Sequence, residues 1–216
     1  MKPSHRLFAP IALAAALAGC AGEGDLVINQ GVGITAVRTA CPAVGVPHYT
    51  GDITLFRTPG QHTADSIDVT ATITNLRSTC NEGGERIYSE ATFDVLARRT
   101  DASEARRVEL PYFSTVLRGG SAVQAKRLGT VVIDFAAGQE RAQGRGVAGA
   151  FIDRAASTLP EDIREQITRP RKPGDPDAAL DPLADPEVRA ALDRANFELL
   201  VGFQLTEEQL TYNVTR

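Results

Sequence analysis

The stretch IDVTATIT, residues 67–74, alternates apolar and polar side chains at every position. A period of two residues is typical of a β-strand that buries one face. The stretch IYSEATFDV, residues 87–95, repeats this pattern, and the turn-forming cluster NEGG, residues 81–84, lies between the two runs. The two runs are therefore predicted to pair as an antiparallel hairpin, and the protein to be mainly β.

Further strand-like runs continue on both sides of this hairpin. Shorter candidates are residues 33–38, 52–57, 107–117, 129–135 and 142–152, and two alternating runs at 199–205 and 210–214 predict a C-terminal hairpin. Thr206 and Gln209 in its turn also fit a capping box, which is compatible with a single helical turn there. Pro111 restricts the middle of its run to an edge position or a bulge, because proline has no N–H for a sheet. Seven or eight short strands with regular turns favour an immunoglobulin-like antiparallel β-sandwich, formed as one domain by residues 33–216.

Residues 153–196 are expected to form a helical insertion before the C-terminal hairpin. One helix is expected at 153–168, and a second begins at Asp185, an N-cap residue followed by Pro186 at the first helical position. Residues 142–150 alternate with a face of small side chains, comprising Ala142, Gly144, Gly146, Ala148 and Ala150. Because small residues permit close approach, we expect the helices to pack against this face.

The first twenty residues contain a basic start, an apolar stretch from Leu7 to Leu17, and the tetrapeptide Leu17-Ala18-Gly19-Cys20. The apolar stretch is too short for a permanent membrane span and is typical of a removable signal. The tetrapeptide resembles the lipobox of bacterial lipoproteins. This resemblance implies a signal peptide at 1–19, a lipidated Cys20 and a short tether up to residue 32. The alternative is a plain secretory signal with an incidental cysteine.

The resemblance also implies a location in the cell envelope. Ala21 follows the cysteine, where enteric lipoproteins of the inner membrane carry an aspartate, so we expect the outer membrane, facing the periplasm. Removing the leader takes Lys2 and Arg6 with it and leaves 21 basic against 27 acidic residues, a net charge of −6. An acidic surface does not suit nucleic acid or an anionic membrane face, so only the N-terminal lipid is expected to contact the membrane.

Two cysteines, Cys41 and Cys80, remain when Cys20 is assigned to lipid. An even pair in an oxidising compartment predicts a disulfide. The alternative is a zinc site that includes His48 and His62, but the gaps between these residues are much wider than those of structural zinc sites.

Two patterns in the sequence resemble ligand-binding sites. Residues 144–149 match GxGxxG, yet the residues that follow keep alternating, so a strand with a small-residue face is expected instead of a dinucleotide site. The acids Asp175, Asp177, Asp181 and Asp185 lack EF-hand spacing, and solvated acids are expected there in place of a calcium site.

No nucleophile signature appears in the sequence. The chain is therefore expected to be no enzyme and to need no cofactor or metal. We expect a lipid-anchored protein that binds an envelope protein partner or scaffolds an envelope complex. The alternative is a membrane-anchored hydrolase that uses carboxylates or a loop histidine, His48 or His62.

Overall fold

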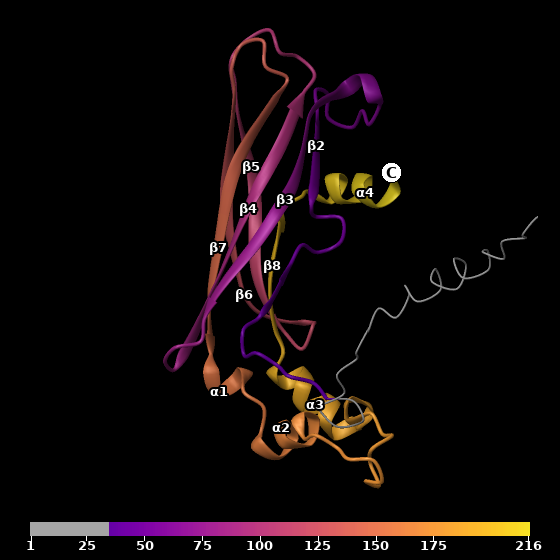
Figure 1. Ribbon diagram of the computed structural model, residues 1–216. Coiled ribbons are helices and arrows are strands. Elements are labelled where there is room, and N and C mark those ends of the chain that lie inside the picture. Colours follow the sequence, from indigo (N-terminus) through magenta and orange to yellow (C-terminus); the bar gives the residue numbers. More distant parts are fainter. Residues whose placement is uncertain (1–34) are drawn as a thin grey trace, which may run out of the picture.

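Two four-stranded sheets pack face to face in the computed structural model, which describes residues 35–216 (Figure 1). The predicted leader, Cys20 and the tether lie outside the described residues. One sheet has the order β1 (Ala43–Gly45), β8 (Phe197–Phe203), β5 (Arg106–Arg118) and β6 (Ala122–Phe135). The other has the order β2 (Asp52–Phe56), β3 (Ile67–Asn81), β4 (Arg86–Arg99) and β7 (Arg141–Asp153). The predicted β-sandwich is confirmed.

Hairpins connect neighbouring strands within each sheet. The predicted pair of alternating runs forms the β3–β4 hairpin, and β5 and β6 form the equivalent hairpin in the other sheet. The chain crosses between the sheets after β1, β4, β6 and β7. All pairs are antiparallel except the short edge pair of β1 with β8, which is parallel.

The core lies between the two sheets and follows the predicted alternation. Val69, Ala71 and Ile73 of β3 are buried, as are Phe93 and Val95 of β4. The opposite sheet contributes further buried side chains, including Leu110, Val131, Ile133, Leu199, Val201 and Phe203. Burial of apolar surface on both inner faces is the main stabilising contribution to such a sandwich.

Pro111 lies inside β5, at a place where its missing N–H breaks no ladder bond. Its carbonyl accepts from the backbone N–H of Gln204, just beyond the last residue of β8. The N and C=O of one strand residue point to the same side, so the ring nitrogen faces the side where β8 has already ended. The expected edge position or bulge is wrong, because β5 lies between β8 and β6 and its register shift falls at Val116/Leu117. Pro111 is tolerated because the pairing of β5 with β8 begins only at Tyr112.

The small-residue face of β7 points into the sandwich, and the expected packing of helices against it is wrong. A Cβ added at Gly146 would lie 2.1 Å from Cζ of Phe93, its partner on β4. A Cβ added at Gly144 would lie 2.7 Å from Cγ1 of Val131 on β6. The small residues therefore make room for a core ring and for the opposite sheet.

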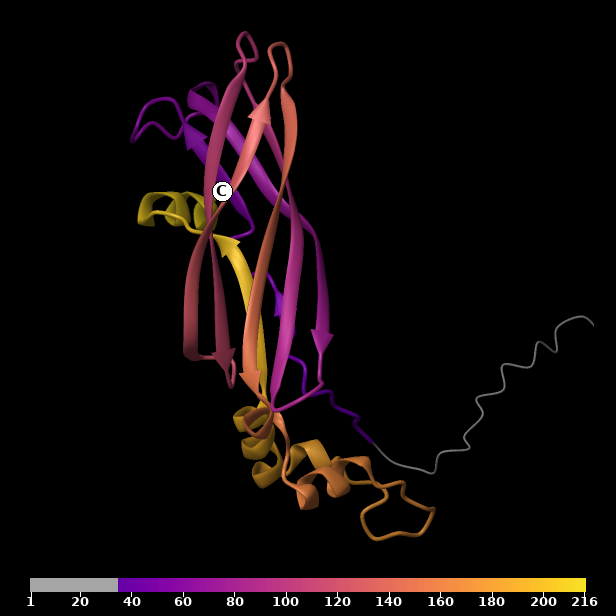
Figure 2. The same ribbon diagram turned by 90° about the vertical axis from the view of Figure 1, so that its left-hand side faces the viewer.

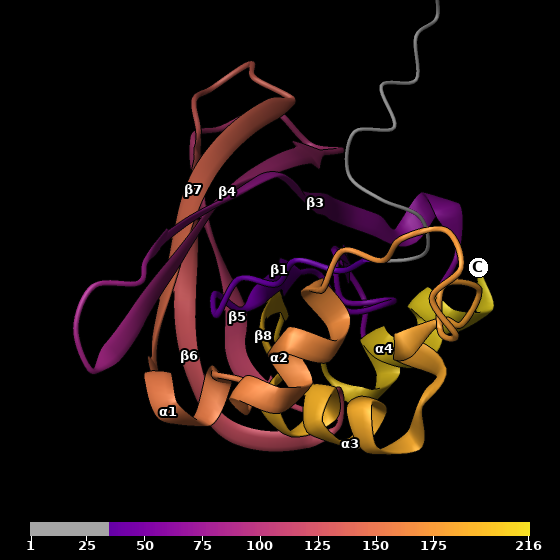
Figure 3. The ribbon, with the colours of Figure 1, turned by 60° about the horizontal axis from the view of Figure 1, so that its bottom comes forward.

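The helical insertion is confirmed and lies at one end of the sandwich (Figure 3). Its elements are α1 (Arg154–Ser157), α2 (Glu161–Thr168), the 3-10 helix Pro182–Ala184 and α3 (Pro186–Ala195). Asp153 and Asp185 cap α1 and α3 by accepting from the backbone N–H groups of Ala156 and Glu187. The helices bury their own small cluster, formed by Ile163, Ile167, Val188 and Ala191, which explains why they do not need the β7 face.

The predicted C-terminal hairpin is wrong in its second strand. The first run forms β8, but the second forms the helix α4 (Glu207–Thr215). Thr206 and Gln209 make a capping box that starts this helix. Asn213 is buried and donates from Nδ2 to the carbonyls of Tyr49 and Asp52, both at 2.8 Å, which holds α4 beside β2.

The N-terminal end of the described chain is irregular. Residues 35–38, which were expected to be extended in a strand, pair with no sheet. They contact the helical insertion instead: the backbone N–H of Ala36 donates to Ile167, and Arg38 donates to the side chain of Asn196 at 3.2 Å. The 3-10 turn Ala64–Ser66 completes the regular elements by leading into β3.

A buried arginine joins the loops at the end of the sandwich opposite the helices. The Arg99 side chain donates to four backbone carbonyls, those of Ala102 and Glu104 after β4 and those of Ala136 and Gln139 after β6. Its guanidinium also lies over the Phe135 ring, 5.0 Å from the centroid. Arg99 therefore fixes both crossover loops against the end of the core.

Candidate functional site

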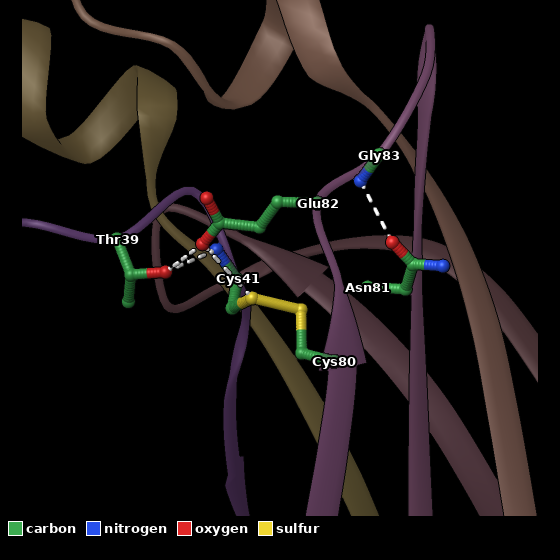
Figure 4. Close-up of a disulfide and its surroundings, with 6 residues drawn as sticks. All are labelled: Thr39, Cys41, Cys80, Asn81, Glu82 and Gly83. Atoms are coloured by element: carbon green, nitrogen blue, oxygen red, sulfur yellow. Dashed lines mark hydrogen bonds between the residues drawn. A yellow bond between two sulfur atoms is a disulfide. The ribbon is translucent and has the colours of Figure 1, made fainter.

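Cys41 and Cys80 form a disulfide, as the sequence predicts (Figure 4). The bridge connects the segment before β1 to the outer part of β3, with the two Cα atoms 6.2 Å apart. Thr39 accepts from the backbone N–H of Cys41 and hydrogen-bonds Glu82 from the same hydroxyl. Both sulfurs are consumed by this bond, which removes them as zinc ligands.

The two loop histidines lie in different surroundings. His48 lies beside the Tyr49 ring. His62 Nε2 lies 3.0 Å from Glu208 Oε1 of α4, and its ring packs against Phe56 and Tyr212, which also contact each other. Within residues 35–216, neither His62 nor Glu208 hydrogen-bonds a serine or threonine hydroxyl. Among the described residues the pair thus has no hydroxyl nucleophile at hydrogen-bond distance, and a histidine base here would act on water.

The four acids of the proline-rich loop each have a separate structural partner. Asp175 accepts from the backbone N–H of Lys172, and Asp181 and Asp185 cap the helices that follow them. Asp177 binds Arg169 and the buried Arg171, and these hydrogen bonds hold the pKa of its carboxyl below the ordinary value of 3.8. Across the described part of the chain, no three potential metal ligands gather into a site.

The GxGxxG match at residues 144–149 lies wholly within β7. A dinucleotide fingerprint requires a helix to start within the glycine pattern, and here the strand continues to Asp153. The strand interpretation from the alternation is therefore confirmed.

A groove opens between the edges of the two sheets. Strands β6 and β7 lie close together beside their connecting loop and separate toward the helical end (Figure 2). The resulting hollow has a volume of about 480 Å³, within the range of ligand pockets. We call it the inter-sheet groove; its lining residues are Arg86, Tyr88, Ser114, Thr115, Val116, Ala125, Lys126, Arg127, Gly149, Ala150, Phe151 and Leu199.

The inner face of β6 changes character inside this groove. Val131 and Ile133 point into the core, so Arg127, in the same alternation, also faces the inter-sheet space. Its register partner on β5 is Ser114, which is in phase with the buried Leu110 and Val116. The inner face of β6 therefore carries apolar side chains near the connecting loop and an exposed arginine, Arg127, where the sheets separate.

Two more basic residues border the groove, with their side chains on the outer faces of the two sheets. Lys126 Nζ is 5.1 Å from the Phe113 ring centroid, and the Arg86 guanidinium is 4.8 Å from that of Phe151. Of the residues the structure describes, none forms an ion pair with Arg86, Lys126 or Arg127. Three positive charges without an ion-pair partner in this part of the structure are a local excess in an acidic protein.

Polar groups on β4 border the same region. The Tyr88 hydroxyl donates to Glu90 at 2.9 Å, and this hydrogen bond raises the pKa of the phenol. Ser89 is 1% exposed, and its Oγ has no hydrogen-bond partner in the described structure. Its register partner, Ala150, lines the groove.

Two other hollows are more open to solvent. One, of about 590 Å³, lies on the outer face of β3, β4 and β7 around Thr72, Leu96 and Gln143. The other, of about 630 Å³, lies along α4 beside His62 and Tyr212. Neither exposes core-facing positions of both sheets, as the inter-sheet groove does.

Sequence reasoning did not identify the inter-sheet groove. The signal was present, because extending the alternation of Val131 and Ile133 backwards places Arg127 on the inner face. The spatial separation of β6 and β7 has no counterpart in the sequence pattern.

In comparisons with known proteins, no family model, no curated protein and no solved structure matches this chain. None of the helices in residues 35–216 is long and apolar enough to cross a membrane.

Proposed function

We propose that this chain is a lipid-anchored protein of the bacterial cell envelope with a non-catalytic binding role, and that the inter-sheet groove holds its partner. The observation that carries the binding role is the exposed, core-facing Arg127 between two separated sheet edges. An ordinary closed sandwich would fill this position with an apolar side chain. A charged side chain among apolar groups in a groove is typical of a binding site.

The anchoring part of the proposal rests on the leader and on Cys20. The disulfide between Cys41 and Cys80 supports it, because such bonds persist in oxidising compartments such as the periplasm. We place the protein at the outer membrane, facing the periplasm, because Ala21 follows Cys20.

The contact of His62 with Glu208 favours one second candidate, a membrane-anchored hydrolase. Such an enzyme would use the histidine as a base oriented by the carboxylate. Its test is hydrolysis of a p-nitrophenyl ester by the purified full chain. Activity that His62→Gln abolishes, while His48→Gln leaves it intact, would establish the hydrolase; equal background rates in all three proteins would reject it.

Anchoring is tested by Cys20→Ser. We expect this variant to leave the membrane fraction and to lose labelling by an alkyne analogue of palmitate, because a covalent lipid is the proposed membrane contact. The matched control is the Cys41→Ser, Cys80→Ser double variant, which should remain labelled. Unchanged labelling of the Cys20→Ser protein would contradict the proposal.

A further inference from the structure

We propose that the inter-sheet groove binds an extended acidic segment of an envelope protein, which adds as a strand to the free edge of β6 and places a carboxylate against Arg127. This inference rests on the proposed binding role and names the chemical class of the partner.

The first argument is the free backbone on both sides of the groove. In the described structure β6 pairs only with β5, and β7 pairs only with β4. Residues 122–128 of β6 are exposed throughout, including Val123 at 63% and Leu128 at 67%. An exposed edge strand presents a row of N–H and C=O groups that an extended peptide can pair with.

The second argument is the charge at the inner position of this edge. Inward-pointing charges protect edge strands because a pairing strand would bury them without a partner. Binding of an apolar strand would therefore bury the Arg127 guanidinium without a partner, whereas a strand that carries a negative charge would pair with it. A carboxylate suits a guanidinium best, because the two can form parallel hydrogen bonds.

The third argument is the remainder of the lining. Lys126 and Arg86 add positive charge beside the groove, on the outer faces of the sheets, while Val116, Leu199 and Ala150 form its apolar floor. A strand that alternates acidic and apolar side chains matches both features. The positive groove would also attract an acidic segment over a distance of about 10 Å, although the chain as a whole is acidic.

Another ligand could use the same charges. An amphiphilic anion, such as a fatty acid or an alkyl phosphate, would contact Arg127 and the apolar floor but would leave the edge of β6 unpaired. The separated, unpaired strand edges favour the peptide, since only a peptide uses them. This difference decides between the two ligands experimentally.

The test measures binding of fluorescein-labelled peptides to the purified full chain by fluorescence anisotropy. The probes are VEVEVEV, VQVQVQV and VKVKVKV, each flanked by Gly-Ser, and a VEVEVEV peptide with alternate backbone amides N-methylated. We expect the glutamate peptide to bind at least about tenfold more tightly than the glutamine peptide, because only it pairs with Arg127. The lysine and N-methylated peptides should bind more weakly still.

Substitutions at Arg127 give a sharper readout than loss of binding. Arg127→Gln should remove the preference for glutamate over glutamine, and Arg127→Glu should reverse the preference toward the lysine peptide. The control is Arg141→Gln, which removes an equally exposed arginine at the other end of the groove-side edge, on β7, and should leave all affinities unchanged. Circular dichroism confirms that each variant is folded.

Three results would overturn the proposal. Equal binding of the N-methylated peptide would show that the edge of β6 is not used. Tight binding of dodecyl phosphate without binding of any peptide would assign the groove to an amphiphile. If no probe binds, the role of Arg127 is only to protect the edge of β6 from pairing with other strands. Failure here is distinguishable from failure of anchoring, because the Cys20→Ser assay measures only lipid labelling and membrane fractionation.

Discussion

Replacing Arg99 by methionine should destabilise the protein more than any other single change of a charged residue described above. The guanidinium is almost fully buried, with a residue exposure of 2%. It donates to the carbonyls of Gln139, Glu104, Ala102 and Ala136 at 2.8, 2.6, 3.2 and 2.9 Å. Methionine retains most of the apolar length of the side chain, so the change tests the donors themselves.

The magnitude follows from the four lost hydrogen bonds. A hydrogen bond to a charged group contributes about 1.5–3 kcal/mol, so four would sum to about 6–12 kcal/mol if all were independent. The carbonyls lie in surface loops, where water replaces part of the loss. We therefore expect a fall of about 3–5 kcal/mol in the free energy of unfolding, the range for breaking a buried charged interaction. Arg99→Lys should lie between, because an ammonium carries three donors and no planar fork.

Urea unfolding with matched m-values gives the measurement. The control is Arg98→Met: this neighbour is 63% exposed and lies 3.6 Å from Glu140, and its loss should change stability by less than about 1 kcal/mol. Amide hydrogen exchange should rise in residues 100–105 and 136–140 of the Arg99→Met protein. If Arg99→Met costs no more than Arg98→Met, the proposed role of Arg99 in fixing the two loops is refuted.

Three further predictions concern the core, the disulfide and a paired acid. Gly146→Leu should lower the free energy of unfolding by about 1–3 kcal/mol, because the added carbons would displace Phe93. The control is Gln143→Leu on the outward-facing side of β7. Equal melting temperatures of the two variants would contradict the reasoning. The Cys41→Ser, Cys80→Ser double variant should lose about 4 kcal/mol of unfolding free energy, and non-reducing mass spectrometry of the wild type should show no free thiol at Cys41 or Cys80; free thiols at these two positions would refute the bond. Asp177 has a pKa below its ordinary value of 3.8, first through its hydrogen bond with Arg169, so its contribution to stability is complete above that value and is lost as the pH falls through the folded-state pKa. The melting temperatures of wild type and Asp177→Asn should therefore differ at pH 6 and converge in strong acid, and a gap that persists at low pH would show that the hydrogen bonds of Asp177 are not responsible.

Local chemistry predicted the elements that depend on it. The alternation at residues 67–74 identified the buried face of β3, and Asp185 with Pro186 marked the start of α3, because both signals act within a few residues of one another. The prediction of a strand from Leu210, Tyr212 and Val214 was wrong for a physical reason. Its alternation is compatible with a strand, but the Thr206–Gln209 capping box and the hydrogen bonds of Asn213 stabilise a helix there.

Tertiary packing decided the remaining features. The small face of β7 correctly indicated a close approach, but the sequence does not specify whether a helix, a ring or a second sheet fills the space. The groove around Arg127 depends on how far β6 and β7 separate, which is a property of the twisted sheets and not of any one segment. Arg127 and Ser114 were therefore recognisable only after the two sheets were placed together.

The disulfide determines the path by which a mechanical force enters the sandwich. The chain before Cys41 leads into β1, which has only three residues and a single neighbouring strand, β8. A pull on the chain upstream of Cys41 would peel such a short strand away readily. The covalent bond to Cys80 instead transmits the tension directly into β3, a fifteen-residue strand that pairs with β4 along most of its length and with β2 over residues 67–72. A protein held from its N-terminal side could thus sustain traction from a bound partner while β1 remains unstressed.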